Sequence, residues 1–131
     1  MPTILIIDDE EVILEYLKML LGKLGYDIIT ARDGAAGCNA LQNHDINLII
    51  SDLIMPGEIS GMNLVRKLRS MRPDCPIIVL TGYPNDENLK DTQELEVEFL
   101  TKPFEIPFLE NLLKRMLPLA PESGGKAGDG K

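Results

Sequence analysis

The sequence is short of several residues on which common protein classes depend. Trp is absent, aromatic residues make up 5% of the 131 residues, and there are only two cysteines, Cys38 and Cys75, and one histidine, His44. Two cysteines are too few for a disulfide scaffold or for a zinc site with four Cys ligands, and one histidine excludes a His-rich metal site. No apolar run approaches the ~18 residues of a membrane-spanning helix, so we expect no membrane insertion.

Basic residues are also scarce. The chain has 13 Lys and Arg against 21 Asp and Glu, which gives a net charge of −8. Nucleic acid repels a surface of this sign, so we expect no direct binding of DNA or RNA. The first residues, Met-Pro-Thr-Ile, lack the basic region with which a signal peptide begins. We therefore expect a cytoplasmic protein with reduced thiols.

Aliphatic residues, by contrast, are abundant. Hydrophobic residues make up 44% of the chain, including 20 Leu and 14 Ile, and this excludes an intrinsically disordered protein. A chain of this length is expected to fold as one domain. The composition changes after Leu117, because residues 118–131 are rich in Gly, Pro and Ser. We predict one domain over residues 1–117 and a flexible tail or linker over residues 118–131.

Five segments have the composition of β-strands. Residues 4–7, 48–50 and 77–80 are almost purely apolar, a pattern typical of strands that are buried on both faces. Residues 26–30 and 97–100 mix apolar and polar side chains, which suits strands at the edges of a sheet. The sequence thus predicts three central strands and two edge strands.

Periodic apolar residues between these segments predict helices. Two helical stripes lie within residues 64–71 and 109–116. Residues 33–43 and 85–95 show weaker helical patterns. A further stripe, which ends at Gly25, is made up of Ile13, Leu17, Leu20 and Leu24.

Strands and helices therefore alternate five times along the chain. Alternation of this kind implies a parallel sheet with helices on both faces. With the apolar strands in the centre and the mixed ones at the edges, the strand order is 2-1-3-4-5, which defines a flavodoxin-like doubly wound α/β fold. In such sheets the functional site lies beyond the carboxyl ends of the strands, where the order reverses, between the first and third strands.

Four of the predicted strands are followed by polar residues that would meet at this edge. Clustered carboxylates repel one another unless a cation joins them, and oxygen ligands suit a hard divalent ion such as Mg²⁺. An Asp at a strand end can also act as a nucleophile and form an acyl phosphate, while a nearby Lys can neutralise a phosphoryl group. The segments are Asp8-Asp9-Glu10-Glu11, Ser51-Asp52, Thr81-Gly82 and Thr101-Lys102-Pro103.

Each segment taken alone also has a structural explanation. Acids at a helix N-terminus stabilise the helix dipole without any metal. Asp52 can serve as a turn or cap residue before Pro56, and Lys102 can be an ordinary solvated side chain. Their joint occurrence at four strand ends favours a functional site.

The four segments, in this order and at these spacings, resemble the receiver domain of the two-component response regulator family. The similarity covers residues 3–117, and the matching motifs span residues 4–10, 52–57, 81–82 and 99–104. The resemblance implies a signalling switch that is controlled by phosphorylation and is not an enzyme, apart from phosphorylation and slow dephosphorylation of its own aspartate.

By this resemblance, Asp52 accepts a phosphoryl group from a histidine kinase or a phosphotransfer protein in a reaction that depends on Mg²⁺. The ion would be bound directly by Asp9 and Asp52, by the backbone carbonyl of Ile54, and by Asp8 through a water molecule. Lys102 would pair with the phosphoryl group.

The resemblance also implies how the switch responds. Thr81 would shift toward the phosphoryl oxygens, and Phe99, the aromatic switch, would move inward behind it. The peptide bond between Lys102 and Pro103 is expected to be cis. These shifts would alter a surface made by the fourth helix, the fifth strand and the fifth helix, which an unknown output protein would bind.

Two residues beside the site suggest a long-lived phosphorylated state. Neither Ile54 nor Tyr83 is a carboxamide or carboxylate that could orient an attacking water, and both are bulky enough to shield an acyl phosphate. We therefore predict slow self-dephosphorylation. We also expect a monomer or weak dimer, either as a stand-alone regulator or as part of a longer chain.

Two other functions on this fold stay open. A small Mg²⁺-dependent phosphohydrolase would place its Asp nucleophile at the first strand, where Asp8-Asp9-Glu10 is a poor match for the acid pair of such enzymes. Turnover of a phosphate ester would favour that alternative. A non-phosphorylated interaction module would have no need for Asp9, Asp52, Thr81 and Lys102 together.

Overall fold

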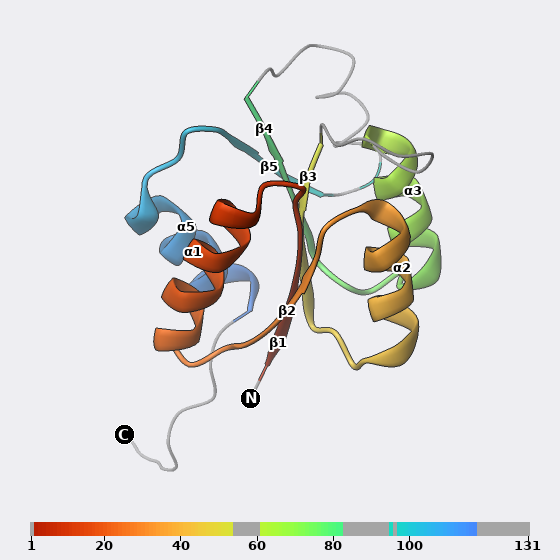
Figure 1. Cartoon of the computed structure of the whole chain (residues 1–131), viewed down its shortest axis with the longest axis horizontal. Helices are drawn as coiled ribbons and strands as arrows, with labels where there is room; N and C mark the ends of the chain where they lie inside the picture. Colours follow the sequence, from red (N-terminus) through yellow and green to blue (C-terminus); the bar gives the residue numbers. More distant parts are fainter. Residues whose placement is uncertain (1, 54–60, 83–94, 96, 118–131) are drawn as a thin grey trace.

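The computed structural model describes residues 2–53, 61–82, 95 and 97–117. Within these residues, five strands form one sheet with the order β2-β1-β3-β4-β5, and every neighbouring pair is parallel. This arrangement confirms the predicted doubly wound α/β fold (Figure 1). The strands are β1 (Thr3–Ile7), β2 (Asp27–Ala31), β3 (Leu48–Asp52), β4 (Ile77–Thr81) and β5 (Glu98–Thr101).

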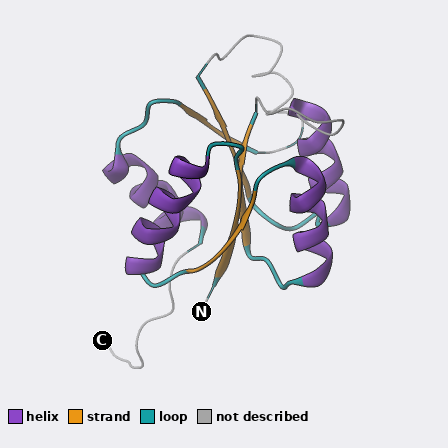
Figure 2. Cartoon of the chain, viewed as in Figure 1, coloured by secondary structure: helices purple, strands orange, loops and turns teal. Residues whose placement is uncertain are grey.

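Helices cover both faces of the sheet. Figure 2 shows α1 and α5 together on one face and α2 and α3 together on the other. The helix predicted over residues 85–95 lies, apart from Leu95, outside the described residues. The helices of the described part are α1 (Glu11–Lys23), α2 (Gly34–Asn43), α3 (Gly61–Met71) and α5 (Ile106–Met116).

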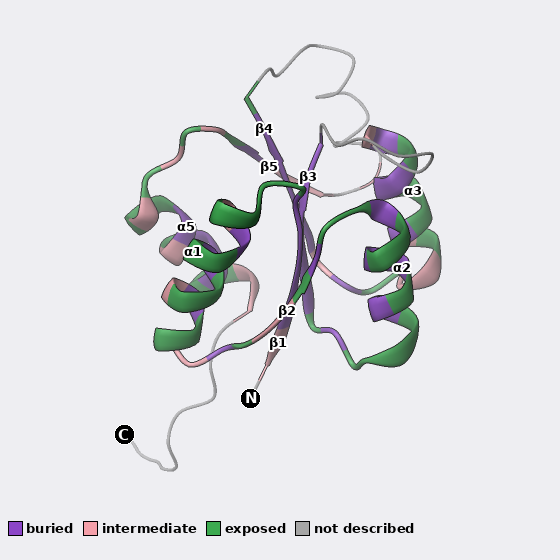
Figure 3. Cartoon of the chain, viewed as in Figure 1, coloured by how far each residue is buried: buried purple, intermediate pink, exposed green. Residues whose placement is uncertain are grey.

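The three central strands are the most deeply buried part of the molecule (Figure 3). Every residue of β3 and β4 is buried, whereas β2 and β5 keep exposed or half-buried positions, as predicted for edge strands. Because side chains alternate along a strand, the core divides in two. Leu5 and Ile7 belong to the cluster under α2 and α3, and Ile4 and Ile6 to the cluster under α1 and α5.

Helix α1 faces the sheet with a slightly different stripe from the predicted one. Leu17 is buried as expected, but its buried neighbours are Leu14 and Leu21. Ile13 and Leu24, which the sequence pattern put on the buried face, are only half-buried at its flank. The apolar arc of this helix is wider than one stripe, so its pattern does not determine the rotation of the helix.

Short connections position the helices against the strands. Gly25 has a φ of 106°, a left-handed conformation that glycine adopts readily after a helix. Asp33 caps α2, because its side chain accepts a hydrogen bond of 2.7 Å from the amide of Ala36. None of the helices in the described residues has the length and apolar character needed to cross a bilayer.

Candidate functional site

Four strands bring the predicted site residues to one edge of the sheet. Asp52 ends β3 and Thr81 ends β4, while Asp8 and Lys102 come directly after β1 and β5. The amide of Asp8 donates a hydrogen bond of 3.1 Å to the carbonyl of Ala31. The amide of Lys102 donates a hydrogen bond of 2.7 Å to the carbonyl of Thr81. These backbone hydrogen bonds extend the sheet by one residue and orient both side chains at the edge where the strand order reverses.

Lys102 lies among three carboxylates. Its Nζ is 3.2 Å from Oδ2 of Asp8, 3.2 Å from Oδ2 of Asp52 and 3.5 Å from Oε1 of Glu10. The side chains of Asp8 and Asp52 are 0% and 7% exposed, whereas that of Glu10 is 62% exposed. The single ammonium therefore contacts two buried carboxylates and one solvent-facing carboxylate, and its one positive charge cannot balance all three.

Opposing effects act on the pKa of Asp8. Burial raises the pKa of this carboxyl, and the negative charge of Asp52 raises it further. The amide of Glu10, which donates to Oδ1 of Asp8 over 2.9 Å, and the ammonium of Lys102 act in the opposite direction. Burial lowers the pKa of Lys102, but the carboxylates of Asp8 and Asp52 outweigh it and raise that pKa overall.

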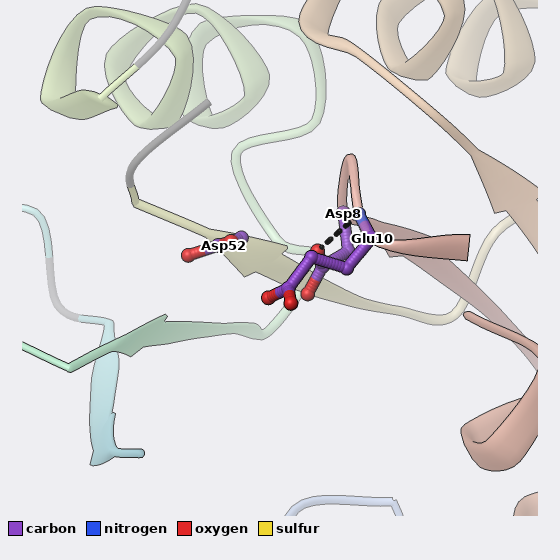
Figure 4. Close-up of side chains that lie close together, drawn as sticks. All are labelled: Asp8, Glu10 and Asp52. Carbon is purple, nitrogen blue, oxygen red and sulfur yellow. Dashed lines mark hydrogen bonds between the residues drawn. The ribbon is translucent and has the colours of Figure 1, made fainter. Parts of the chain in front are cut away.

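The carboxylates also fit a hard cation. Asp8, Glu10 and Asp52 each offer an oxygen, and the three oxygens lie within 4.8 Å of one another. Figure 4 shows Asp8 and Glu10 on the segment after β1 and Asp52 at the end of β3. An all-oxygen donor set with two buried carboxylates is of the kind that Mg²⁺ prefers.

The sequence placed Glu10 in the acidic segment at this edge but gave it no individual role, whereas it assigned the neighbouring Asp9 to the metal. Asp9 is exposed and does not belong to the oxygen trio. Residues after a strand end leave the strict alternation of the sheet, so the run of four acids does not reveal which of them turn inward. The signal for Glu10 was the length of the acidic run itself.

The other predicted residues vary in their placement. Thr81 is completely buried, and Phe99 is half-buried against the core cluster under α2 and α3. The peptide bond between Lys102 and Pro103 is cis, as predicted. Ile54 and Tyr83 lie outside the described residues.

Comparison with known proteins identifies the class that this fold and site define. The sequence model of one protein family, the response regulator receiver domain, matches residues 4–114 of the chain. The chain belongs to this family. It is therefore a receiver domain, the regulatory switch module of two-component response regulators.

Curated relatives share this segment. The chain is 36% identical over 101 residues to the transcriptional regulatory protein GlrR of Escherichia coli K12. The aligned segment covers 76% of this chain and 22% of GlrR. It is 37% identical over 123 residues to the aerobic respiration control protein ArcA of the same strain, covering 90% of this chain and 51% of ArcA. The chain thus spans about half or less of the length of these relatives.

Solved structures share the fold over nearly the whole described chain. The chemotaxis protein CheY4 of Vibrio cholerae is 29% identical with a TM-score of 0.81, covering 89% of this chain and 99% of CheY4. The response regulator TrrA of Thermotoga maritima, solved in complex with Mg²⁺ and BeF, is 34% identical with a TM-score of 0.79, covering 89% of this chain and 100% of TrrA.

Proposed function

We propose that Asp52 is the phosphoacceptor of this receiver domain and that a histidine kinase or phosphotransfer protein supplies the phosphoryl group. The observation that carries the proposal is the nearly buried carboxylate of Asp52 with the ammonium of Lys102 3.2 Å from its Oδ2. A cation beside the nucleophile offsets the negative charge of an incoming phosphodonor. The same cation then pairs with the phosphoryl group on Asp52.

The transfer is a displacement at phosphorus. A carboxylate oxygen of Asp52 forms the new P–O bond while the P–N bond to the phosphohistidine of the donor breaks. The departing imidazole keeps the bonding electron pair and takes up a proton. Before the transfer Lys102 carries its charge at neutral pH, because the carboxylates of Asp8 and Asp52 raise its pKa.

Mg²⁺ is the cofactor that we propose for this step. Asp9 and Asp52 would bind it directly, together with the backbone carbonyl of Ile54, and Asp8 would bind it through a water molecule. The oxygen trio of Asp8, Glu10 and Asp52 supports oxygen-donor chemistry at this edge. When bound, the ion neutralises phosphoryl oxygens in the transition state. The Mg²⁺ and BeF in the TrrA complex are consistent with such a site in a similar protein.

The phosphorylated state would be read through small displacements. Thr81 would move toward the phosphoryl group and Phe99 would follow it inward, which biases the surface that β5 and α5 share with the predicted fourth helix. An output protein or an output region would bind this surface. GlrR and ArcA are regulators of transcription and respiration by name, and for this segment itself we propose contact with protein rather than with DNA. We also propose a cytoplasmic location and a monomer or weak dimer.

Mass measurement of the intact chain tests the proposal. Incubation with Mg²⁺ and phosphoramidate should add one phosphoryl group to the parent chain and none to Asp52→Asn. Asp45→Asn is the matched control, because it removes a carboxylate whose side chain is 94% exposed and should leave the adduct intact. An adduct that persists in Asp52→Asn, or none in the parent, would contradict the assignment, and chelation of Mg²⁺ should abolish the reaction.

A further inference from the structure

Glu10 occupies an unusual position for an acid at the start of a helix. It is the N-cap residue of α1, yet its side chain makes no capping hydrogen bond with the helix. The shorter Asp, Asn, Ser and Thr side chains at this position normally accept from the free amides of the first turn, whereas the longer side chain of a Glu can extend elsewhere. Here the carboxylate instead lies 3.5 Å from Nζ of Lys102, a residue 92 positions away in the chain.

The three carboxylates around Lys102 match the three protons of its ammonium. A lysine ammonium has three donors and no acceptor, and Asp8, Glu10 and Asp52 supply one acceptor oxygen each. A phosphoryl group on Asp52 adds oxygens that need the same donors. Lys102 must therefore release one carboxylate before it can bind the phosphoryl group fully.

Burial decides which carboxylate is released. Asp8 is completely buried, so a lost ion pair would leave it without solvent compensation. Asp52 carries the phosphoryl group itself. Glu10 is 62% exposed and the most distant of the three, so water can replace the ammonium there at little cost.

We propose, on the basis of the proposed function, that Glu10 is a positioning residue. It restrains Lys102 through their ion pair in the unphosphorylated state, and this ion pair breaks when Asp52 is phosphorylated. The Glu10–Lys102 pair then opposes phosphoryl transfer, because it holds the ammonium in competition with the incoming group. The pair is partly exposed, so its removal should accelerate phosphorylation by about two- to fivefold, the range typical of such pairs.

Three substitutions separate contact from charge. Glu10→Gln removes the charge, whereas Glu10→Asp keeps the charge but shortens the side chain, so that an oxygen already 3.5 Å from Nζ loses its reach. Glu11→Gln is the matched control, because Glu11 is the next acid along the chain and is exposed in the first turn of α1. The measured quantity is the second-order rate constant for adduct formation with phosphoramidate at saturating Mg²⁺, so that loss of a Glu10 oxygen from the trio that fits the cation does not limit the rate. Urea unfolding is the check on folding.

The proposal expects both Glu10 variants to react about two- to fivefold faster than the parent and Glu11→Gln to react at the parental rate. Acceleration in Glu10→Gln and Glu11→Gln but not in Glu10→Asp would assign the effect to charge alone and overturn the proposal. Parental or slower rates in both Glu10 variants would overturn it while leaving the proposed function intact. A parent chain that forms no adduct would overturn both.

Discussion

Asp8 is the side chain at which the chemistry of the site and the stability of the fold are opposed. It is completely buried, and burial together with the charge of Asp52 raises its pKa. Its ionised form is therefore less favourable in the folded than in the unfolded chain. A bound cation would offset this unfavourable charge, so a carboxylate in this position favours cation binding.

Asp8→Asn should therefore stabilise the protein in the absence of divalent ions. The amide keeps an oxygen for the backbone N–H of Glu10 and removes the buried charge, so we expect the free energy of unfolding to rise by about 1 kcal/mol at neutral pH. Urea unfolding in the presence of a chelator measures this difference. Added Mg²⁺ should stabilise the parent more than the variant, and equal stabilisation of both chains would argue against a role of Asp8 in binding the ion.

The sign of the pH dependence follows from the direction of the shift. For an acid with a raised pKa, the stabilising contribution is complete below the ordinary value of 3.8 and is lost as the pH rises through the raised value. The advantage of Asp8→Asn should thus be greatest at neutral pH and should shrink on acidification, because the parent becomes neutral at that position too. A difference that grows toward low pH would refute this account.

At the scale of elements, α2 packs tightly against β1 at Gly37. A Cβ at Gly37 would lie 2.5 Å from Cδ1 and 3.0 Å from Cγ1 of Ile7, which is completely buried. Ile7 is the last residue of β1 and precedes Asp8. The absence of a side chain at Gly37 thus lets the helix approach the strand that carries the first carboxylate.

Two glycine substitutions test this packing. Gly37→Ala should lower the free energy of unfolding by about 1–2 kcal/mol, because overpacking against Ile7 outweighs the better helix propensity of alanine. Gly22→Ala in α1 is the matched control, since a Cβ there meets nothing within 4 Å, and it should raise stability by about 0.5–1 kcal/mol. Urea unfolding decides, and equal effects of the two substitutions would show that the contact is unimportant.

The elements themselves were largely predictable from sequence, because buried parallel strands are unbroken aliphatic runs and edge strands are not. That rule predicted the strand order, and the strand order predicted that Asp8, Asp52, Thr81 and Lys102 converge. The contact of Glu10 with Lys102 was not predictable, since Glu10 lies beyond the end of β1 and reaches Lys102 only through its side-chain conformation. The rotation of α1 was missed for a related reason, because several aliphatic residues compete for one buried face.

At the scale of the whole molecule, one hydrogen bond joins the segment before β2 to the C-terminal end of α5. Tyr26, just before β2, is buried, and its hydroxyl donates to the backbone carbonyl of Leu117 over 2.9 Å. Burial raises the pKa of this hydroxyl, so it remains a donor at neutral pH. Leu117, the C-cap of α5, is thereby joined to a residue 91 positions earlier in the chain.

This hydrogen bond predicts where the chain can be shortened. A chain that ends at Leu117 keeps every described residue of both core clusters and the acceptor for Tyr26, so we expect its free energy of unfolding to stay within about 0.5 kcal/mol of the full chain. A chain that ends at Leu112 loses Leu113, which is 1% exposed, and leaves the buried hydroxyl of Tyr26 without its carbonyl. It should lose about 3 kcal/mol or more, since both a buried side chain and a buried hydrogen bond disappear.

Urea unfolding of the three chains, followed by mass measurement after treatment with Mg²⁺ and phosphoramidate, provides the test. The chain that ends at Leu117 should accept one phosphoryl group as the full chain does, because Asp8, Asp52 and Lys102 are joined by contacts that lie entirely within it. If this chain instead unfolded as readily as the one that ends at Leu112, residues 118–131 would have to contribute to the fold. The predicted boundary at residue 117 would then be wrong, and the tail would be an integral part of the switch rather than a linker.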